Sequence, residues 1–318
     1  MASNVENQVN KIFRHVREGS YATRDKYASV CRDFARHCHQ NFRLNNLRNI
    51  SDKHLTSYVR ELQDRGIEAK TIKTNLGAIR FLHSRIDRPR YLQLADNRLL
   101  ENKYSVTFEQ VKAVNGNRAW TKAEYEGMQE IARKSAVGPA ADTAQNVTDC
   151  MILARTMGMR VAEAACARRS QAEHALRTGM YPIGKEAKNG RPREVPLSPE
   201  ARRMFERRLA VTNRGDRLFV KSGEKAHQVI NRMEKFVERH RDKVVTSEGL
   251  EKRVDLRDGS TRELTFHGLR YAYVQDRMAS EIDRGRTWEE AAAIVSKEVG
   301  HNRTEVIKIY EGGTGSQD

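Results

Sequence analysis

Apolar residues recur at three- and four-residue steps along the first third of the chain, which is the spacing of a buried helix face. Three such series lie at 27–38, 55–62 and 72–82, and each predicts a helix. Gly66 ends the second helix and Pro89 follows the third, as expected of helix-terminating residues. The positions that carry the pattern are Tyr27, Val30, Cys31, Phe34, Cys38, Leu55, Tyr58, Val59, Leu62, Ile72, Leu76, Ile79, Phe81 and Leu82.

The apolar pattern fades between Arg88 and Trp120, so we expect the domain linker in this interval. The predicted organisation is a helical domain at 1–105, a linker at 106–120 and a second domain at 121–318. A chain of 318 residues is long enough for two domains that each bury a core.

Helical patterns return in the second domain. A capped helix is predicted from Thr121, and an apolar-rich helix spans 146–168 with an interruption at Gly158. Helices resume at Pro199, and the last third of the chain is helical through Ile309. The second domain is therefore mainly helical as well.

One hairpin interrupts these helices. Short extended runs at 181–183 and 193–197 flank Asn189 and Gly190, and Asn-Gly between such runs is a strong hairpin signal. Residues 241–262 lack periodicity and predict a loop or a second short hairpin. The expected fold class is mainly α with a small antiparallel β-sheet.

Charge adds the first indication of function. The net charge is +16 with a pI near 9.8, and more than half of the positive excess lies in residues 1–105. A surface this basic attracts polyanions, usually nucleic acid, although a ribosomal or generally basic protein would share the property. No apolar run approaches the roughly 18 residues of a membrane span, and the N-terminus lacks a secretion-signal layout. A soluble cytoplasmic protein without membrane contact is expected.

The cysteines do not indicate a metal site. Cys31 and Cys38 flank His37 and lie next to His39, which raises the possibility of zinc. The spacing fits no zinc pattern, and no second ligand pair follows. We expect reduced thiols and no bound metal.

Four cations, Lys70, Lys73, Arg80 and Arg85, lie along the third predicted helix. Such cations often form only a solvated helix face. The local excess of positive charge favours contact with DNA phosphates instead. These four residues are therefore DNA-binding candidates.

His267 and Arg270 lie three residues apart, which places them on one face of a helix. A guanidinium is a planar, permanently charged donor suited to phosphate oxygens, and an imidazole adds another donor. A chance His-x-x-Arg is the alternative, because the chain contains 10 histidines and many arginines.

His301 follows Gly300 and precedes Tyr310 by nine residues. A tyrosine is a poor nucleophile at its ordinary pKa of roughly 10. It becomes useful where cations stabilise both the phenolate and the transition state. The alternative is an aromatic residue that anchors a terminal helix.

Arg160 follows Gly158 late in an apolar helix, with Glu163 three residues further on. A buried arginine without a partner is costly, so it pairs or binds an anion. Glu163 is placed to orient it, and a plain ion pair within the helix is the alternative.

The predicted hairpin carries Lys185, Lys188 and Arg191 near its turn. A lysine near a β-turn can reach over a substrate on the open side of a sheet. Most basic turns are only solvated, so this feature is weak when taken alone.

Taken in order, these residues resemble the tyrosine recombinase (phage integrase) family, whose pattern runs Arg, hairpin Lys, His-x-x-Arg, Gly-His and, nine residues on, Tyr. The resemblance spans about residues 120–312, and residues 1–105 look like the family's helical DNA-binding domain. It implies a helical N-terminal DNA-binding domain followed by an α+β catalytic domain. The matching catalytic positions are Arg160, Lys188 (with Lys185 as the fallback), His267, Arg270, His301 and the nucleophile Tyr310, with Glu163 as a supporting residue and Arg191 as a further DNA-binding candidate.

The resemblance also implies an activity. Members of this family cleave and rejoin double-stranded DNA at specific recombination sites through a 3′-phosphotyrosine link, without a cofactor. It implies a homo-tetramer on DNA, accessory DNA-bending proteins, association with the nucleoid when bound, and integration or excision of a mobile element. The alternatives are a type IB topoisomerase and a non-catalytic DNA-binding regulator derived from an integrase.

Two departures from the family pattern stand out. The interval from Arg270 to His301 is 31 residues, longer than in compact members, and the extra length is expected around 283–288. Only eight residues follow Tyr310, which is too short for the C-terminal helix that many relatives place on a neighbouring protomer. How protomers interlock is therefore left open.

Overall fold

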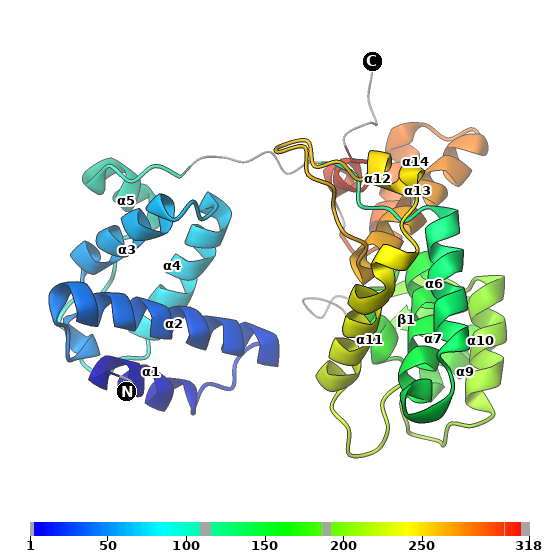
Figure 1. Cartoon of the computed structure of the whole chain (residues 1–318), viewed down its shortest axis with the longest axis horizontal. Coiled ribbons are helices and arrows are strands. Elements are labelled where there is room, and N and C mark those ends of the chain that lie inside the picture. Colours follow the sequence, from blue (N-terminus) through cyan, green and yellow to red (C-terminus); the bar gives the residue numbers. More distant parts are fainter. Residues whose placement is uncertain (1–2, 109–115, 185, 187–191, 302, 313–318) are drawn as a thin grey trace. The chain divides into compact units, whose positions relative to one another are not determined.

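A computed structural model shows the chain as two compact units, Met1–Lys112 and Ala113–Asp318, called here the N-terminal unit and the C-terminal unit (Figure 1). No helix in the described parts is both long and apolar enough to cross a membrane. The structure describes residues 3–108, 116–184, 186, 192–301 and 303–312.

The described part of the N-terminal unit folds around one apolar core. Its helices are α1 (Asn4–Phe13), α2 (Tyr21–Phe42), α3 (Asp52–Asp64), α4 (Ala69–His83) and α5 (Asn97–Tyr104), with a 3-10 turn η1 (Leu47–Asn49). Helix α2 packs against α1, α3 and α4. Phe34, Leu55, Leu76 and Ile79 are fully buried in this core, and all four belong to the apolar pattern that predicted α2, α3 and α4. Those three predictions are confirmed.

Helices α1 and α5 were not predicted individually. Helix α5 buries only Leu100, so its sequence shows no periodic apolar face. It begins at Asp96, whose carboxylate accepts a hydrogen bond from the Leu99 amide at 2.7 Å. Of the predicted linker at 106–120, residues 109–115 lie outside the described residues.

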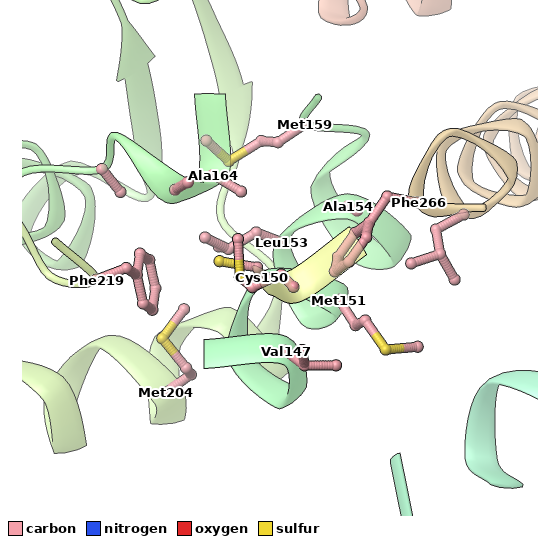
Figure 2. Packing of buried hydrophobic residues seen from close by; sticks show 14 of the residues in the cluster. Val147, Cys150, Met151, Leu153, Ala154, Met159, Ala164, Met204, Phe219 and Phe266 are labelled. Atoms are coloured by element: carbon pink, nitrogen blue, oxygen red, sulfur yellow. The ribbon is translucent and has the colours of Figure 1, made fainter. Parts of the chain in front are cut away.

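The C-terminal unit is built around helix α7. Its helices are α6 (Lys122–Lys134), α7 (Ala141–Met157), α8 (Val161–Ala165), α9 (Arg169–Thr178), α10 (Pro199–Leu209), α11 (Ala226–His240), α12 (Ser247–Lys252), α13 (Phe266–Asp283), α14 (Trp288–Glu298) and α15 (Ile307–Tyr310), with 3-10 turns η2 (Gly138–Ala140), η4 (Arg241–Lys243) and η5 (Thr304–Val306). Helix α7 packs against α6, α10, α11 and α13. Figure 2 shows Cys150 and Leu153 of α7 between Phe219 and Phe266, which approach from different segments.

The predicted interruption at Gly158 is confirmed, and it sets the path of the chain. Helix α7 ends at Met157, and Gly158 adopts a left-handed conformation with φ of 61°. A Cβ atom at this position would overlap the ring of Tyr273, so both the backbone angle and the close packing require glycine. The chain then turns so that Arg160 directly precedes α8, at its N-cap position.

The predicted hairpin is confirmed. Strands β1 (Met180–Ile183) and β2 (Arg193–Pro196) pair antiparallel, with Tyr181 opposite Val195. Both of these side chains are fully buried. The predicted Asn189-Gly190 turn lies outside the described residues. The expected fold class, mainly α with a small antiparallel sheet, is confirmed.

Residues 241–262 contain more structure than predicted. The isolated bridge between Val254 and Thr261 agrees with a second short hairpin, but helix α12 was missed. A fully buried ion pair anchors this segment, because the Arg253 guanidinium donates to both carboxylate oxygens of Glu124 at 2.6 and 2.8 Å. A pair that joins positions so far apart leaves no local sequence pattern.

Candidate active site

The hydroxyl of Tyr310 lies between a guanidinium and an imidazole. Its oxygen accepts a hydrogen bond from Arg270 Nε at 3.1 Å and lies 3.0 Å from His301 Nε2. Tyr310 is the last residue of the one-turn helix α15 and is only 4% exposed. The structure therefore brings together three of the predicted site residues, which come from α13, from α15 and from the segment that follows α14.

Arg270 is held on every side. It lies in the second turn of α13 and is fully buried. Its two terminal nitrogens donate to the backbone carbonyls of Gly158 and Val299, while Nε donates to Tyr310. Burial lowers the pKa of Arg270, although an arginine stays protonated at neutral pH. The position and orientation of the Arg270 guanidinium are therefore fixed by the fold.

Arg160 is oriented by a shared carboxylate. Glu163 accepts hydrogen bonds from the Arg160 guanidinium and amide, both at 2.8 Å. The same carboxylate accepts two more from Arg193 of β2, at 2.7 and 3.0 Å. Burial opposes ionisation of Glu163, but hydrogen bonding and charge from Arg193 outweigh it and lower the pKa of Glu163 to about 2. The carboxylate therefore stays ionised and holds both guanidinium groups.

His301 follows α14 and is half-buried. Burial, followed by the positive charges of Arg270 and Arg160, lowers the pKa of His301 from 6.5 to about 4. The imidazole is therefore neutral near pH 7, where one ring nitrogen can donate a hydrogen bond and the other can accept one.

This low pKa of His301 predicts a pH-dependent stability. Between about pH 6.5 and pH 4 the unfolded chain binds more protons at His301 than the folded chain does, so the free energy of unfolding falls as the pH drops. The contribution is at most about 3 kcal/mol, and partial exposure reduces it. We expect His301→Gln to flatten this part of the pH profile, measured by urea unfolding at pH 4.5 and 7. Exposed His15→Gln is the control, and an unchanged slope in His301→Gln would contradict the expectation.

His267 lies in the first turn of α13 and is exposed. The centroid of its ring is 6.2 Å from that of Tyr310 and 5.4 Å from that of Tyr271. With Arg160, His267 lines a pocket of about 660 Å³ that also includes Arg241. This pocket provides open space next to the buried cluster.

The hairpin cations are not placed. Lys188, its fallback Lys185 and the DNA-binding candidate Arg191 lie outside the described residues, so their roles stay predictions.

Of the four cations predicted on the third helix, Lys70, Lys73 and Arg80 lie on α4, and Arg85 follows its end. Lys70 and Arg85 are exposed, while Lys73 and Arg80 are half-buried. Arg80 donates to the Ala95 carbonyl and to the Asn97 side chain, so its guanidinium links α4 to the start of α5. Their contact with DNA stays a prediction.

Arg193 is a site residue that the sequence did not single out. Its guanidinium is almost completely buried, and its Nε donates to the Glu298 carbonyl at 2.8 Å, which ties β2 to the end of α14. The strand pattern could have identified Arg193, because residues two apart in a strand share a face and Val195, two positions on, is an apolar residue of the core. An arginine on the same face as Val195 has to point inward and needs a carboxylate.

Within the described residues, no group of three or more His, Cys, Asp and Glu side chains is arranged to hold a metal ion. Cys31 is buried and donates to the Ala78 carbonyl, and Cys38 is a buried free thiol. His37 contacts Glu61 and Ser57.

Comparisons with known proteins agree on one fold. Residues 2–92 match the family described as "Phage integrase, N-terminal". The XerH site-specific recombinase in a post-cleavage complex with a palindromic difH substrate is similar, with a TM-score of 0.56 and 17% identity over 96% of this chain and 80% of that chain. The Tn1549 transposon integrase in complex with a circular intermediate DNA has a TM-score of 0.56 and 12% identity over 98% and 95%. No curated protein matches the chain.

Proposed function

We propose that this chain belongs to the tyrosine recombinase (phage integrase) family, which the match of residues 2–92 and the shared fold support, and that it is a site-specific DNA recombinase that cleaves and rejoins strands through a 3′-phosphotyrosine intermediate. The observation that carries the proposal is the position of the Tyr310 hydroxyl, between Arg270 at 3.1 Å and His301 at 3.0 Å. A buried phenol surrounded by fixed cationic and neutral donors suits attack on a phosphodiester.

In the proposed reaction the Tyr310 oxygen bonds to phosphorus as the bond to the 5′-oxygen breaks. Arg160 and Arg270 stabilise the non-bridging oxygens, where negative charge builds up. His267 helps to take the proton of Tyr310, whose hydroxyl lies 3.0 Å from the neutral His301 Nε2. The departing 5′-oxygen takes a proton from Lys188, because an alkoxide is a poor leaving group.

Rejoining reverses these steps. A 5′-hydroxyl attacks the phosphotyrosine and releases Tyr310, with His301 donating to a phosphate oxygen. The bond energy is kept in the phosphotyrosine, so neither ATP nor a metal is required.

The proposed substrate is double-stranded DNA at specific recombination sites, and integration or excision of a mobile element is the proposed role. The net charge of +16 supports binding to DNA. We propose a homo-tetramer on two duplexes, with accessory DNA-bending proteins. The predicted DNA contacts are Lys70, Lys73, Arg80, Arg85 and Arg191.

The test uses DNA from the region flanking the gene, where short direct repeats would mark a target site. A nicked suicide substrate that contains such a repeat should yield a covalent protein–DNA adduct on a denaturing gel. Relaxation of any plasmid without site preference would favour a type IB topoisomerase. Sequence-specific gel shifts without an adduct would favour a non-catalytic regulator, and either result would overturn the proposal.

Arg193→Gln is expected to lower the cleavage rate by up to about 100-fold, because loss of the buried partner leaves Glu163 and Arg160 misaligned with the phosphate. The rate is measured in a single turnover at saturating DNA. Arg177→Gln removes an exposed arginine of α9 and serves as the matched control. Equal rates in the two variants would show that Glu163 orients Arg160 without Arg193.

A further inference from the structure

The element that carries Tyr310 is too short to hold its own position. Helix α15 has only four residues, Ile307–Tyr310, and follows the 3-10 turn η5. A single helical turn is unstable in isolation, because the cost of its first hydrogen bond is not repaid by further turns. The position of the Tyr310 hydroxyl therefore depends on side chains from other elements.

Two sets of hydrogen bonds within the C-terminal unit hold residues 303–310, which include α15. Before α15, the Ser296 hydroxyl accepts from the Arg303 amide and donates to its carbonyl, both at 3.0 Å. At Tyr310 itself, Gln275 Nε2 donates to the backbone carbonyl at 2.7 Å and to Asn117 Oδ1 at 2.9 Å. These contacts fix the start of the segment and the backbone of Tyr310.

A third anchor holds the residue directly after Tyr310. The indole N–H of Trp288 lies 3.1 and 3.2 Å from the two carboxylate oxygens of Glu311. The Trp288 ring packs against the cluster that contains the buried side chains of Ile307 and Tyr310. Lys308 Nζ lies 5.3 Å from the centroid of the same ring, within the range of a cation–π contact.

This tryptophan lies where the sequence predicts a departure from the family pattern. Trp288 is the first residue of α14 and lies at the end of 283–288, where the sequence predicts the extra length between Arg270 and His301. Thr287 begins the helix through a reciprocal capping box with Glu290, which fixes Trp288 in the first helical turn. The capped start of α14 therefore presents a side chain that contacts Glu311, the residue directly after Tyr310.

We propose that Trp288 and Glu311 form a clamp of positioning residues that keeps the Tyr310 hydroxyl in its pocket for attack. The clamp acts through the backbone of α15, and neither side chain touches the reacting phosphate. It deepens the proposed function and rests on it. Because a displacement of about 1 Å can reduce a rate by about 100-fold, one hydrogen-bonded anchor is enough to affect cleavage.

The test compares Trp288→Phe, Glu311→Gln and Glu311→Ala in the full-length protein. Trp288→Phe keeps a packed ring but removes the N–H donor, and Glu311→Gln keeps an acceptor oxygen. We expect single-turnover cleavage of a suicide substrate to fall about tenfold in Trp288→Phe and Glu311→Ala. Glu311→Gln should stay within about twofold of the unchanged protein, and the Kd for DNA should stay constant in all three. Glu289→Gln, an exposed neighbour in α14, is the control.

A double variant and a measurement without DNA separate a clamp from a structural role. Trp288→Phe combined with Glu311→Ala should be no slower than either single variant, because both remove the same contact. Amide hydrogen exchange at Tyr310 and Glu311 should quicken in Trp288→Phe, while the melting temperature changes little.

Two results would overturn the clamp. One is unchanged cleavage and exchange in Trp288→Phe. The other is loss of stability in all three variants in proportion to their loss of rate. If Trp288→Phe fails to fold, the cleavage rates of Glu311→Gln and Glu311→Ala decide, because equal rates in these two variants would contradict the clamp. Absence of an adduct in the unchanged protein would instead refute the proposed function, while the exchange experiment would still report on the clamp.

Discussion

Tyr310→Phe is expected to form no covalent adduct with DNA while it binds the same DNA with unchanged affinity. The substitution removes one oxygen, the atom that Arg270 and His301 contact at 3.1 and 3.0 Å. The ring itself remains packed against Tyr271, at 4.6 Å between centroids. Loss of a nucleophile typically lowers the rate by about 10⁵-fold or more, so adduct formation on a suicide substrate should fall to background.

The matched control for this prediction is Tyr271→Phe. Tyr271 is as buried as Tyr310 and lies beside it, so this variant removes a phenol from the same neighbourhood. It should still form the adduct. Tyr310→Phe should also lose about 1–3 kcal/mol of stability, because the buried Nε of Arg270 is left without its acceptor. An adduct that persists in Tyr310→Phe would remove Tyr310 from the proposed role.

Local patterns predicted much of the fold because they report which face of an element is buried. The apolar steps predicted α2, α3 and α4, and Gly158 predicted the break between α7 and α8. Elements without a repeated buried position escaped prediction. Helix α5 buries one residue, Leu100, and is stabilised at its start by Asp96 instead.

The site was only partly accessible from sequence. Periodicity indicates that a residue points inward, but it does not name the partner it meets there. Arg193 bonds the Glu298 carbonyl 105 positions away, and Gln275 bonds Asn117 158 positions away. Such pairs are set by the way helices and the hairpin pack together, which no local spacing records.

The helix face shared by His267 and Arg270 illustrates the same limit. Both residues lie near Tyr310, as expected of positions three apart, but Arg270 is fully buried while His267 is exposed. His267 lies in the first turn of α13, at the edge of the core. One turn further, Arg270 reaches the carbonyls of Gly158 and Val299. Depth along the helix, rather than its face, decides the environment of each residue.

The contacts of Arg270 lead to the second large expected effect. Arg270→Lys should lower the cleavage rate by about 10²- to 10³-fold, the usual effect of removing one fixed donor from a charged transition state. A lysine has one nitrogen, which cannot occupy the three places from which the guanidinium reaches Gly158, Val299 and Tyr310. The measurement is single-turnover adduct formation at saturating DNA, together with urea unfolding.

Arg277→Lys separates chemistry from stability. Arg277 lies two turns further along α13 and donates to the carboxylates of Glu298 and Glu281, so the same substitution also removes hydrogen bonds from a partly buried guanidinium. It should lower the free energy of unfolding but reduce cleavage far less than Arg270→Lys. Equal losses of rate at equal losses of stability would mean that Arg270 supports the fold and not the transition state. A selective loss of rate in Arg270→Lys would show that the placed Arg270 guanidinium itself supports cleavage, since lysine keeps the charge and the two arginines share a helix but differ in what their guanidinium groups contact.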